Sequence, residues 1–262
     1  MNLGIQNRKA IVAGASAGLG YSSAVALANE GVELFISARG KDRLDAAAQK
    51  IIKETGACVT PITADHSTRE GRAALLAACP EPDIFVITCS PPKMTEDYRK
   101  IKEEDWHESA ATTLVGPIEL MRMTIEGMVA RRWGRIVNIA TIAAKHPVEA
   151  RLLSGPTRSA LVNYAVAISK KVARDNVIIN NLLPGFHHTP SMDQILSTWA
   201  EQNGTTYQQE LESLIERLRI PIKRLGNSDD FAAICAMFCS EFINGVVGQN
   251  LAVDGGISHG LF

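Results

Sequence analysis

The stretch KAIVAGASAGLGYSSAVALANEG, residues 9–31, decides the fold because it joins a strand, a glycine-rich turn and a helix without a break. Residues 9–14 form a nearly continuous apolar run, which is typical of a strand buried on both faces of a parallel sheet. After the turn, apolar residues recur at helical spacing and stop at Gly31, a natural helix end. The turn carries three spaced glycines and one hydroxyl: Gly14, Ser16, Gly18 and Gly20.

Such a turn suits a pyrophosphate group. Glycines let the backbone approach the phosphates closely, and the N-terminus of the following helix offers free N–H groups and a partial positive charge. Ser16 adds a hydroxyl donor. The stretch therefore predicts the first unit of a dinucleotide-binding fold, with a tight turn kept only for packing as the alternative.

The same strand–helix alternation continues along the chain. Further strand-like apolar runs lie at 32–38, 58–63, 83–88, 135–140, 177–183 and 250–253. Helical segments are expected between them, at 41–56, 104–131 and 152–174. This rhythm predicts a Rossmann-type α/β fold, a doubly wound parallel sheet between two layers of helices. No linker divides residues 1–262, so we expect a single domain. The polar segment 186–226 is expected to form a helical excursion that serves as a substrate lid.

The composition excludes several classes of protein. The chain has 262 residues, of which 46% are hydrophobic and 21% charged, and a formal net charge of −1. This balance suits a soluble protein with a large core and no bulk attraction to nucleic acid or anionic membranes. Five cysteines without a CxxC pair argue against a disulfide framework and a metal site, so we expect a cytoplasmic protein. No signal segment or membrane-length apolar run is visible.

The end of the second strand indicates which dinucleotide is bound. An acidic residue there would bind the ribose 2′-hydroxyl of NAD. Here Ala38 and Arg39 occupy the position. A small neutral residue leaves room for a 2′-phosphate, and Arg can bind it bidentately. The pair therefore favours NADP(H) over NAD(H), with a solvated Arg at a strand end as the alternative.

Further motifs resemble the short-chain dehydrogenase/reductase family, and its 3-oxoacyl-ACP-reductase-like members in particular. They are GASAGLG at 14–20, Asp65 after the third strand, GRIVNIAT at 134–141, LLPGFHHT at 182–189 and GQNLAVDGG at 248–256. The resemblance covers nearly the whole chain, and its C-terminal motif is more distinctive than the glycine-rich turn. It implies an NADP(H)-dependent oxidoreductase acting on a carbonyl or an alcohol.

The resemblance also implies which residues hold the cofactor. Asp65 and the backbone near His66 would hold the adenine, and Pro184, Gly185 and Thr189 would contact the nicotinamide half. The full set of expected cofactor residues is Gly14, Ser16, Gly18, Leu19, Gly20, Arg39, Asp65, His66, Cys89, Pro184, Gly185 and Thr189. Segments 104–131 and 152–174 would build a homodimer or homotetramer, and a hetero-oligomer with an active homologue is the alternative.

The catalytic positions depart from the family pattern. The family's Asn, Ser, Tyr and Lys fall here on Thr113, Thr141, Ser154 and Arg158. Ser154 and Arg158 stand one helical turn apart, whereas Tyr164 and Lys170 do not and cannot restore the pair. Serine is a weaker acid than a phenol, whose pKa is about 10, and Arg stays charged. Ser154 could equally be a helix N-cap.

Three histidines are candidate proton donors instead: His146, His187 and His188. Solvated or hydrogen-bonded loop histidines are the simpler interpretation. Three functions stay open: an oxidoreductase with a remodelled site, a non-catalytic subunit or nucleotide-binding partner, and a lyase or isomerase using the same cleft. Apolar residues between 190 and 220 favour a small, partly apolar substrate; a helix packed on the domain would show the same pattern.

Overall fold

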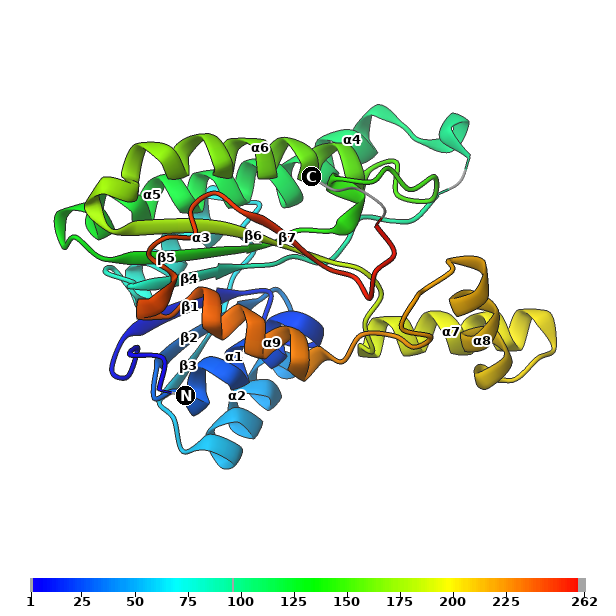
Figure 1. The fold of residues 1–262 in the computed structure, drawn as a ribbon, viewed down its shortest axis with the longest axis horizontal. Helices are drawn as coiled ribbons and strands as arrows, with labels where there is room; N and C mark the ends of the chain where they lie inside the picture. Colours follow the sequence, from blue (N-terminus) through cyan, green and yellow to red (C-terminus); the bar gives the residue numbers. More distant parts are fainter. Residues whose placement is uncertain (1, 96, 259–262) are drawn as a thin grey trace.

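Seven parallel strands form one sheet in the computed structural model, which describes residues 2–95 and 97–258 (Figure 1). The strands are β1 (Lys9–Ala13), β2 (Glu33–Ala38), β3 (Val59–Thr63), β4 (Ile84–Ile87), β5 (Gly134–Ile139), β6 (Val177–Pro184) and β7 (Asn250–Val253). Their order is β3-β2-β1-β4-β5-β6-β7, and every neighbouring pair is parallel. The strand order reverses between β1 and β4, where ligands bind in open α/β sheets.

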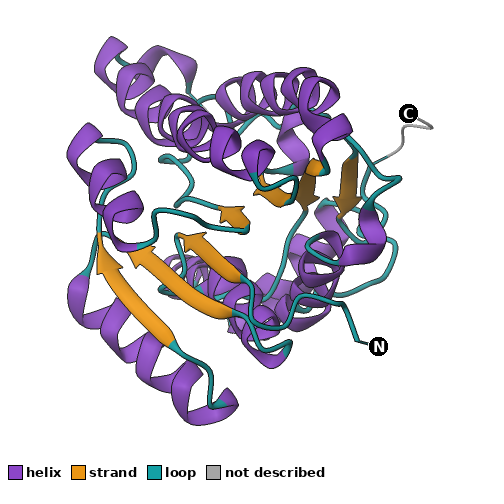
Figure 2. Ribbon diagram, turned by 90° about the vertical axis from the view of Figure 1, so that its left-hand side faces the viewer, coloured by secondary structure: helices purple, strands orange, loops and turns teal. Residues whose placement is uncertain are grey.

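Helices cover both faces of this sheet (Figure 2). They are α1 (Gly18–Asn29), α2 (Lys41–Thr55), α3 (Arg69–Ala78), α4 (Glu103–Ala110), α5 (Gly116–Ala130), α6 (Ser154–Val172), α7 (Pro190–Asn203), α8 (Tyr207–Arg217) and α9 (Ser228–Phe238). Short 3₁₀ turns lie at Tyr98–Lys100, Ile142–Ala144, Ala173–Asp175 and Glu241–Ile243. The Rossmann-type α/β fold expected from the sequence is confirmed.

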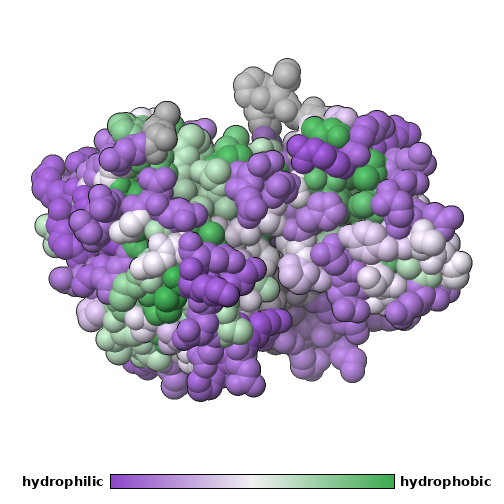
Figure 3. Space-filling model, turned by 90° about the horizontal axis from the view of Figure 1, so that it is seen from below, coloured by the Kyte–Doolittle hydropathy of each residue, from purple (hydrophilic) through white to green (hydrophobic). Residues whose placement is uncertain are grey.

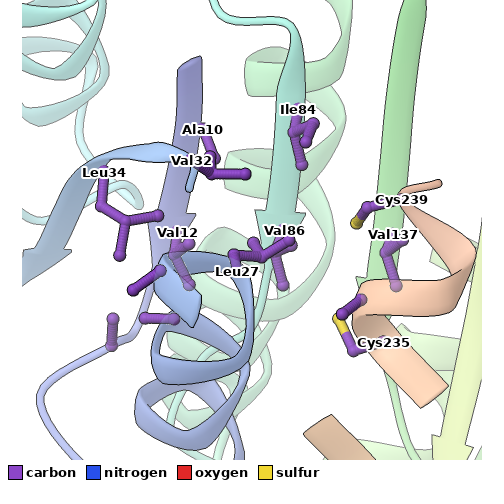
Figure 4. Packing of buried hydrophobic residues seen from close by; sticks show 14 of the residues in the cluster. Ala10, Val12, Leu27, Val32, Leu34, Ile84, Val86, Val137, Cys235 and Cys239 are labelled. Atoms are coloured by element: carbon purple, nitrogen blue, oxygen red, sulfur yellow. The ribbon is translucent and has the colours of Figure 1, made fainter. Parts of the chain in front are cut away.

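Successive side chains of each strand enter different cores, because strand side chains alternate between the faces of a sheet. Val12 packs with Leu27 of α1 and with α2 and α9 on one face, as Figure 4 shows for part of this cluster. Ile11 packs with α3, α5 and α6 on the other face. Burial on both faces explains why these strands are apolar runs without alternation.

The long helical segment expected at 104–131 is interrupted. Helix α4 ends at Ala110, a π-helical turn spans Ala111–Val115, and α5 begins at Gly116. Here the Thr113 hydroxyl donates to the Ser109 carbonyl oxygen at 2.7 Å. Periodicity does not reveal one extra residue within a helical run, so the sequence did not predict this turn. A second difference is that Ser154 is the first residue of α6, with Leu153 in the N-cap position.

The excursion at 186–226 contains α7 and α8, which project from the body beside the carboxyl ends of the strands (Figure 1). Its two ends are joined by backbone hydrogen bonds, from His188 N to Gly226 O (2.9 Å) and from Gly226 N to Phe186 O (2.8 Å). The helix pair has its own apolar cluster, including Met192, Leu196, Leu214, Ile215, Ile220 and Leu225. The excursion is therefore a small packed unit whose two connecting segments are hydrogen-bonded to each other.

The exposed surface is largely polar. Seen from below, it is mostly hydrophilic, and its apolar residues lie in separate patches (Figure 3). Within residues 2–95 and 97–258, no helix is both long and apolar enough to cross a membrane.

One buried arginine joins the amino end of β5 to the C-terminal region. The Arg135 guanidinium is fully buried and donates to the Ser240 carbonyl (2.9 Å), the Asn176 carbonyl (3.0 Å) and Asn244 Oδ1 (2.7 Å). It also lies over the Trp133 ring, 4.5 Å from the ring centroid. With an apolar side chain here, the Ser240 carbonyl and Asn244 Oδ1 would lose this donor, whereas the Asn176 carbonyl would keep the Gly134 N–H at 3.1 Å.

We expect Arg135→Met to lower the free energy of unfolding by about 2–4 kcal/mol, because buried acceptors left without a partner carry a desolvation penalty. Arg174→Met, at a highly exposed arginine, should change it by less than about 0.5 kcal/mol. Urea denaturation of both variants measures the difference. Equal stability of the two variants would contradict this role of Arg135.

Candidate functional site

A cavity of about 910 Å³ runs along the carboxyl edge of the sheet. Its wall includes residues that follow β1, β2, β4, β5 and β6, together with residues of α6 and α7. All of the residues expected to hold the cofactor line it: Gly14, Ser16, Gly18, Leu19, Gly20, Arg39, Asp65, His66, Cys89, Pro184, Gly185 and Thr189. The volume lies within the roughly 300–1,000 Å³ common for cofactor and small-molecule sites.

The glycine-rich turn packs so closely against the chain's own backbone that side chains would not fit at Gly14 and Gly20. Gly14 has φ 76°, and a Cβ built there would lie 2.6 Å from the Thr88 carbonyl oxygen. Helix α1 begins at Gly18 with no side-chain cap and no acidic residue in its first turn. Hydroxyl or amide side chains cap α3, α7, α8 and α9, whereas α2, α5 and α6 lack a side-chain cap as α1 does. The uncapped N–H groups of α1 fit a pyrophosphate.

The adenosine end of the cavity carries two arginines and one carboxylate. Arg39 and Arg43 are exposed and line the wall, and Asp65 lies beside them after β3. Burial raises the pKa of Asp65, but hydrogen bonds from Ser67 and the charge of Arg39 outweigh burial and lower it. Asp65 is therefore an acceptor near neutral pH. Arg43 was not predicted from the sequence. Its position four residues after Arg39 could have indicated a second cation at this site.

At the other end, Arg158 of α6 is 5% exposed and reaches between two strand ends. Its Nη1 donates to the Ala140 carbonyl at 2.6 Å, just beyond β5. Its Nη2 donates to the Cys89 carbonyl at 3.1 Å, just beyond β4, and contacts the Cys89 sulfur at 3.2 Å. The guanidinium is therefore a positive charge that the backbone holds in place.

Thr141 and Ser154 line the cavity near this charge. Thr141 Oγ1 accepts from the Ala143 N–H at 3.3 Å, which starts the 3₁₀ turn after β5. The first turn of α6 packs closely against this loop, since a Cβ built at Gly155 would lie 3.3 Å from the Ala143 carbonyl oxygen. Ser154 is buried, and its hydroxyl has no hydrogen-bond partner among the described residues. Its oxygen is therefore available to a ligand.

Thr113 does not line the cavity. It is fully buried in the π-helical turn, with its Oγ1 2.6 Å from Thr157 Oγ1. Thr157 Oγ1 also lies 2.9 Å from the Leu153 carbonyl oxygen, at the start of α6. Thr113 thus contacts the first turn of α6 through Thr157.

The structure separates the three candidate histidines. His187 alone among them lines the cavity; it is buried, and burial lowers its pKa. His188 is exposed, with Nδ1 3.8 Å from the Asp193 carboxylate. His146 lies in the loop after Thr141 and outside the cavity wall. Within the described part of the chain, no group of three or more His, Cys, Asp or Glu residues could hold a metal.

Cys89 has an electropositive environment at the cavity wall. Burial raises the pKa of its thiol, but the Arg158 guanidinium and the His66 imidazole outweigh burial and lower it. Cys79 is different, since burial raises its pKa to about 11. Thiolate reactivity should therefore concentrate at Cys89 among these two thiols.

In a Cys58→Ser background, which removes an exposed thiol, the rate of Cys89 alkylation by iodoacetamide should inflect below the ordinary thiol pKa of about 8.5. Arg158→Met should move the inflection to higher pH, because a cation that stabilises the thiolate is lost. Arg158→Lys should keep it low. Peptide mass spectrometry gives the rates, and an inflection that Arg158→Met leaves in place would contradict this assignment.

Comparisons with known proteins match this geometry. A family model described as Enoyl-(Acyl carrier protein) reductase matches residues 14–258. The NADPH-dependent reductase BacG of Bacillus subtilis is 28% identical, with 96% of this chain and 98% of that protein covered. The 3-oxoacyl-[acyl-carrier-protein] reductase FabG of Aquifex aeolicus is 24% identical, with 98% and 100% covered.

The structure of L-sorbose reductase from Gluconobacter frateurii, solved with NADPH and L-sorbose, superposes with a TM-score of 0.95. The two chains are 28% identical, and each is covered completely. The NADPH in that complex agrees with the NADP(H) expected from Ala38 and Arg39. The chain belongs to the short-chain dehydrogenase/reductase family, within the group described by the enoyl-(acyl carrier protein) reductase model.

Proposed function

We propose that this chain is a cytoplasmic, NADP(H)-dependent oxidoreductase that interconverts a carbonyl and an alcohol at a non-standard active site. One observation carries the proposal: a single cavity continues from Arg39 and the glycine-rich turn to Thr141, Ser154 and Arg158. The names of the relatives support it, since they are reductases. The chain would act as one domain, in a homodimer or homotetramer built through α4, α5 and α6.

The residues present fit NADP(H). The uncapped start of α1 would hold the pyrophosphate, Arg39 and Arg43 the 2′-phosphate, and Asp65 with the backbone near His66 the adenine. Pro184, Gly185 and Thr189 would contact the nicotinamide half. When bound, the cofactor supplies or accepts the hydride.

The chain's own side chains would manage the charge and the proton. Thr141 would orient the carbonyl oxygen through its hydroxyl. Arg158 would stabilise negative charge developing on that oxygen, because it is a fixed cation in a largely buried site. It is not a proton donor, since it stays charged. Ser154 would pass a proton through a bridging water, because its side chain is shorter than a tyrosine.

Two further parts would position these groups. Thr113 would act through Thr157, which fixes the first turn of α6 and with it Ser154. The excursion 186–226 would act as the substrate lid, because Met192 and Ile195 of α7 line the cavity. Its apolar lining suits a partly apolar substrate.

A non-catalytic nucleotide-binding subunit is the second candidate function. It is favoured by the bonds of Arg158 to backbone carbonyls, which give that residue a structural task independent of chemistry. Binding of NADPH without reduction of any carbonyl compound would support this second function.

Replacing Ala38 by Asp and Arg39 by Leu should raise the Kd for NADPH at least tenfold and lower that for NADH. The 2′-phosphate would lose its cation, and the carboxylate would accept from the 2′-hydroxyl of NADH. Enhancement of nicotinamide fluorescence measures both constants. Lys41→Gln is the matched control, because Lys41 is exposed, pairs with Asp45 and does not line the cavity. An unchanged preference would contradict the NADP(H) assignment.

Ser154→Ala and Arg158→Met should each lower kcat about 10²-fold with an accepted carbonyl substrate, the lower range for loss of a group that acts in the transition state. NADPH affinity should stay within a few-fold for Ser154→Ala. Steady-state NADPH oxidation gives kcat, and the fluorescence titration reports whether the cofactor site is intact. Turnover that survives both changes would remove these residues from the mechanism.

A further inference from the structure

The substrate end of the cavity contains a second arginine, Arg151, which the proposed reaction does not use. Arg151 lies in the loop before α6, where its backbone forms a parallel bridge with Thr95. It is partly buried and lines the cavity, as do Arg158 and Ser154. The loop is held by the Ser154 N–H, which donates to the Arg151 carbonyl oxygen at 3.1 Å. Two arginines therefore line the same cavity as the Ser154 hydroxyl, which has no partner among the described residues.

These two arginines differ in what their N–H groups do. All the Nη contacts of Arg158 go to the Ile139, Ala140 and Cys89 carbonyls and to the Cys89 sulfur. The Arg151 side chain donates no hydrogen bond to a described residue. Arg158 thus contributes charge, while the planar fork of Arg151 is left for a ligand.

No negative charge balances this pair within the described residues, which leave out Glu96. No carboxylate there lies within ion-pair distance of Arg151 or Arg158. Among the described residues of the cavity wall, Asp65 alone is acidic, and it lies at the adenosine end beside Arg39. Burial, and then the charge of Arg158, lowers the pKa of Arg151, as expected for a cation held near a like charge.

Among the described residues Arg151 has no partner, and an anionic ligand would offset the cost of a partly buried, unpaired guanidinium. The Arg fork binds the two oxygens of a carboxylate with two parallel hydrogen bonds. The cavity wall also contains apolar Met94, Ile142 and Val148, which suit the carbon chain of a ligand, and the Thr141 and Ser154 hydroxyls, which suit its carbonyl oxygen. The single fork of Arg151 matches the two oxygens of a carboxylate, and a phosphate is the alternative anion that the test includes.

We propose that the substrate is an oxo acid, whose carboxylate Arg151 binds while its carbonyl faces Thr141 and Ser154. The proposal rests on the proposed function and narrows its substrate class. Arg158 adds to the attraction through its charge, without a direct contact to the carboxylate.

The test compares each acid with its own neutral ester. NADPH oxidation is followed with acetoacetate and 4-methyl-2-oxopentanoate, each beside its methyl ester, and with dihydroxyacetone phosphate beside dihydroxyacetone. For at least one acid we expect a kcat/KM at least tenfold above that of its ester. Arg151→Gln should remove this preference mainly through KM, and leave the ester within about twofold. Arg151→Lys should restore part of it.

Arg99→Gln is the matched control, because it removes one positive charge from an exposed arginine that pairs with Asp97 outside the cavity. It should leave the acid preference unchanged. A fluorescence titration with NADPH shows that each variant is folded. An ester turned over as well as its acid, an equal effect of Arg151→Gln on both, or a preference for dihydroxyacetone phosphate would overturn the proposal.

Absence of turnover with every carbonyl compound would count against the proposed function. In that case a binding measurement tests separately whether Arg151 holds a carboxylate. Isothermal titration of the same two oxo acids into the protein–NADP⁺ complex should give binding that Arg151→Gln abolishes and Arg99→Gln retains. Binding of neither acid, or binding that Arg151→Gln leaves intact, would overturn the oxo-acid proposal.

Discussion

The Arg158 guanidinium holds together the parts of the chain on which the substrate end of the cavity depends. It extends from α6 and donates to the Ala140 and Cys89 carbonyls, which follow β5 and β4. Carbonyl oxygens at these strand ends would otherwise face a largely buried space without a donor. The same contacts fix the first turn of α6, and so the place of Ser154. Burial raises the pKa of Cys89, but this charge and the His66 imidazole outweigh burial and lower it; for Arg151, burial lowers the pKa and the charge of Arg158 lowers it further.

The two ends of the cavity differ in character as a consequence. At the nucleotide end, the uncapped start of α1, Arg39, Arg43 and Asp65 form a set that fits NADP(H). At the substrate end, the residues are a threonine, a serine and two arginines. In the proposed reaction this set would orient a substrate and stabilise an oxyanion, and the proton would come through a water. In the proposed reaction, the fixed charge of the arginines would therefore contribute more than a strongly acidic side chain.

The sequence predicted the fold well because strands buried on both faces leave a strong signal. Apolar runs such as 177–183 lie within a residue or two of the observed strands, here β6 at Val177–Pro184. The glycine-rich turn could be predicted because positive φ at Gly14 and close approach to the Thr88 carbonyl need a residue without a side chain. The apolar runs and the glycine spacing each depend on a short stretch of chain, so both can be recognised from the sequence alone.

Features that depend on contacts between distant segments could not be predicted. The π-helical turn at Ala111–Val115 leaves no mark on apolar spacing, yet it places Thr113 against Thr157 and outside the cavity wall. Arg151 reaches the cavity because its loop bridges to Thr95, a contact between segments far apart in the chain. The bonds from the Arg158 Nη groups to strand-end carbonyls likewise required the folded arrangement of β4, β5 and α6.

The most direct test of this account is a crystal structure of the protein with NADPH. We expect the 2′-phosphate at Arg39 and Arg43, the pyrophosphate at the start of α1, and the nicotinamide beside Thr141 and Ser154. Arg158 should keep its bonds to the Ala140 and Cys89 carbonyls. A nucleotide bound elsewhere, or an Arg158 side chain that leaves both carbonyls to contact the nicotinamide ribose, would contradict the account.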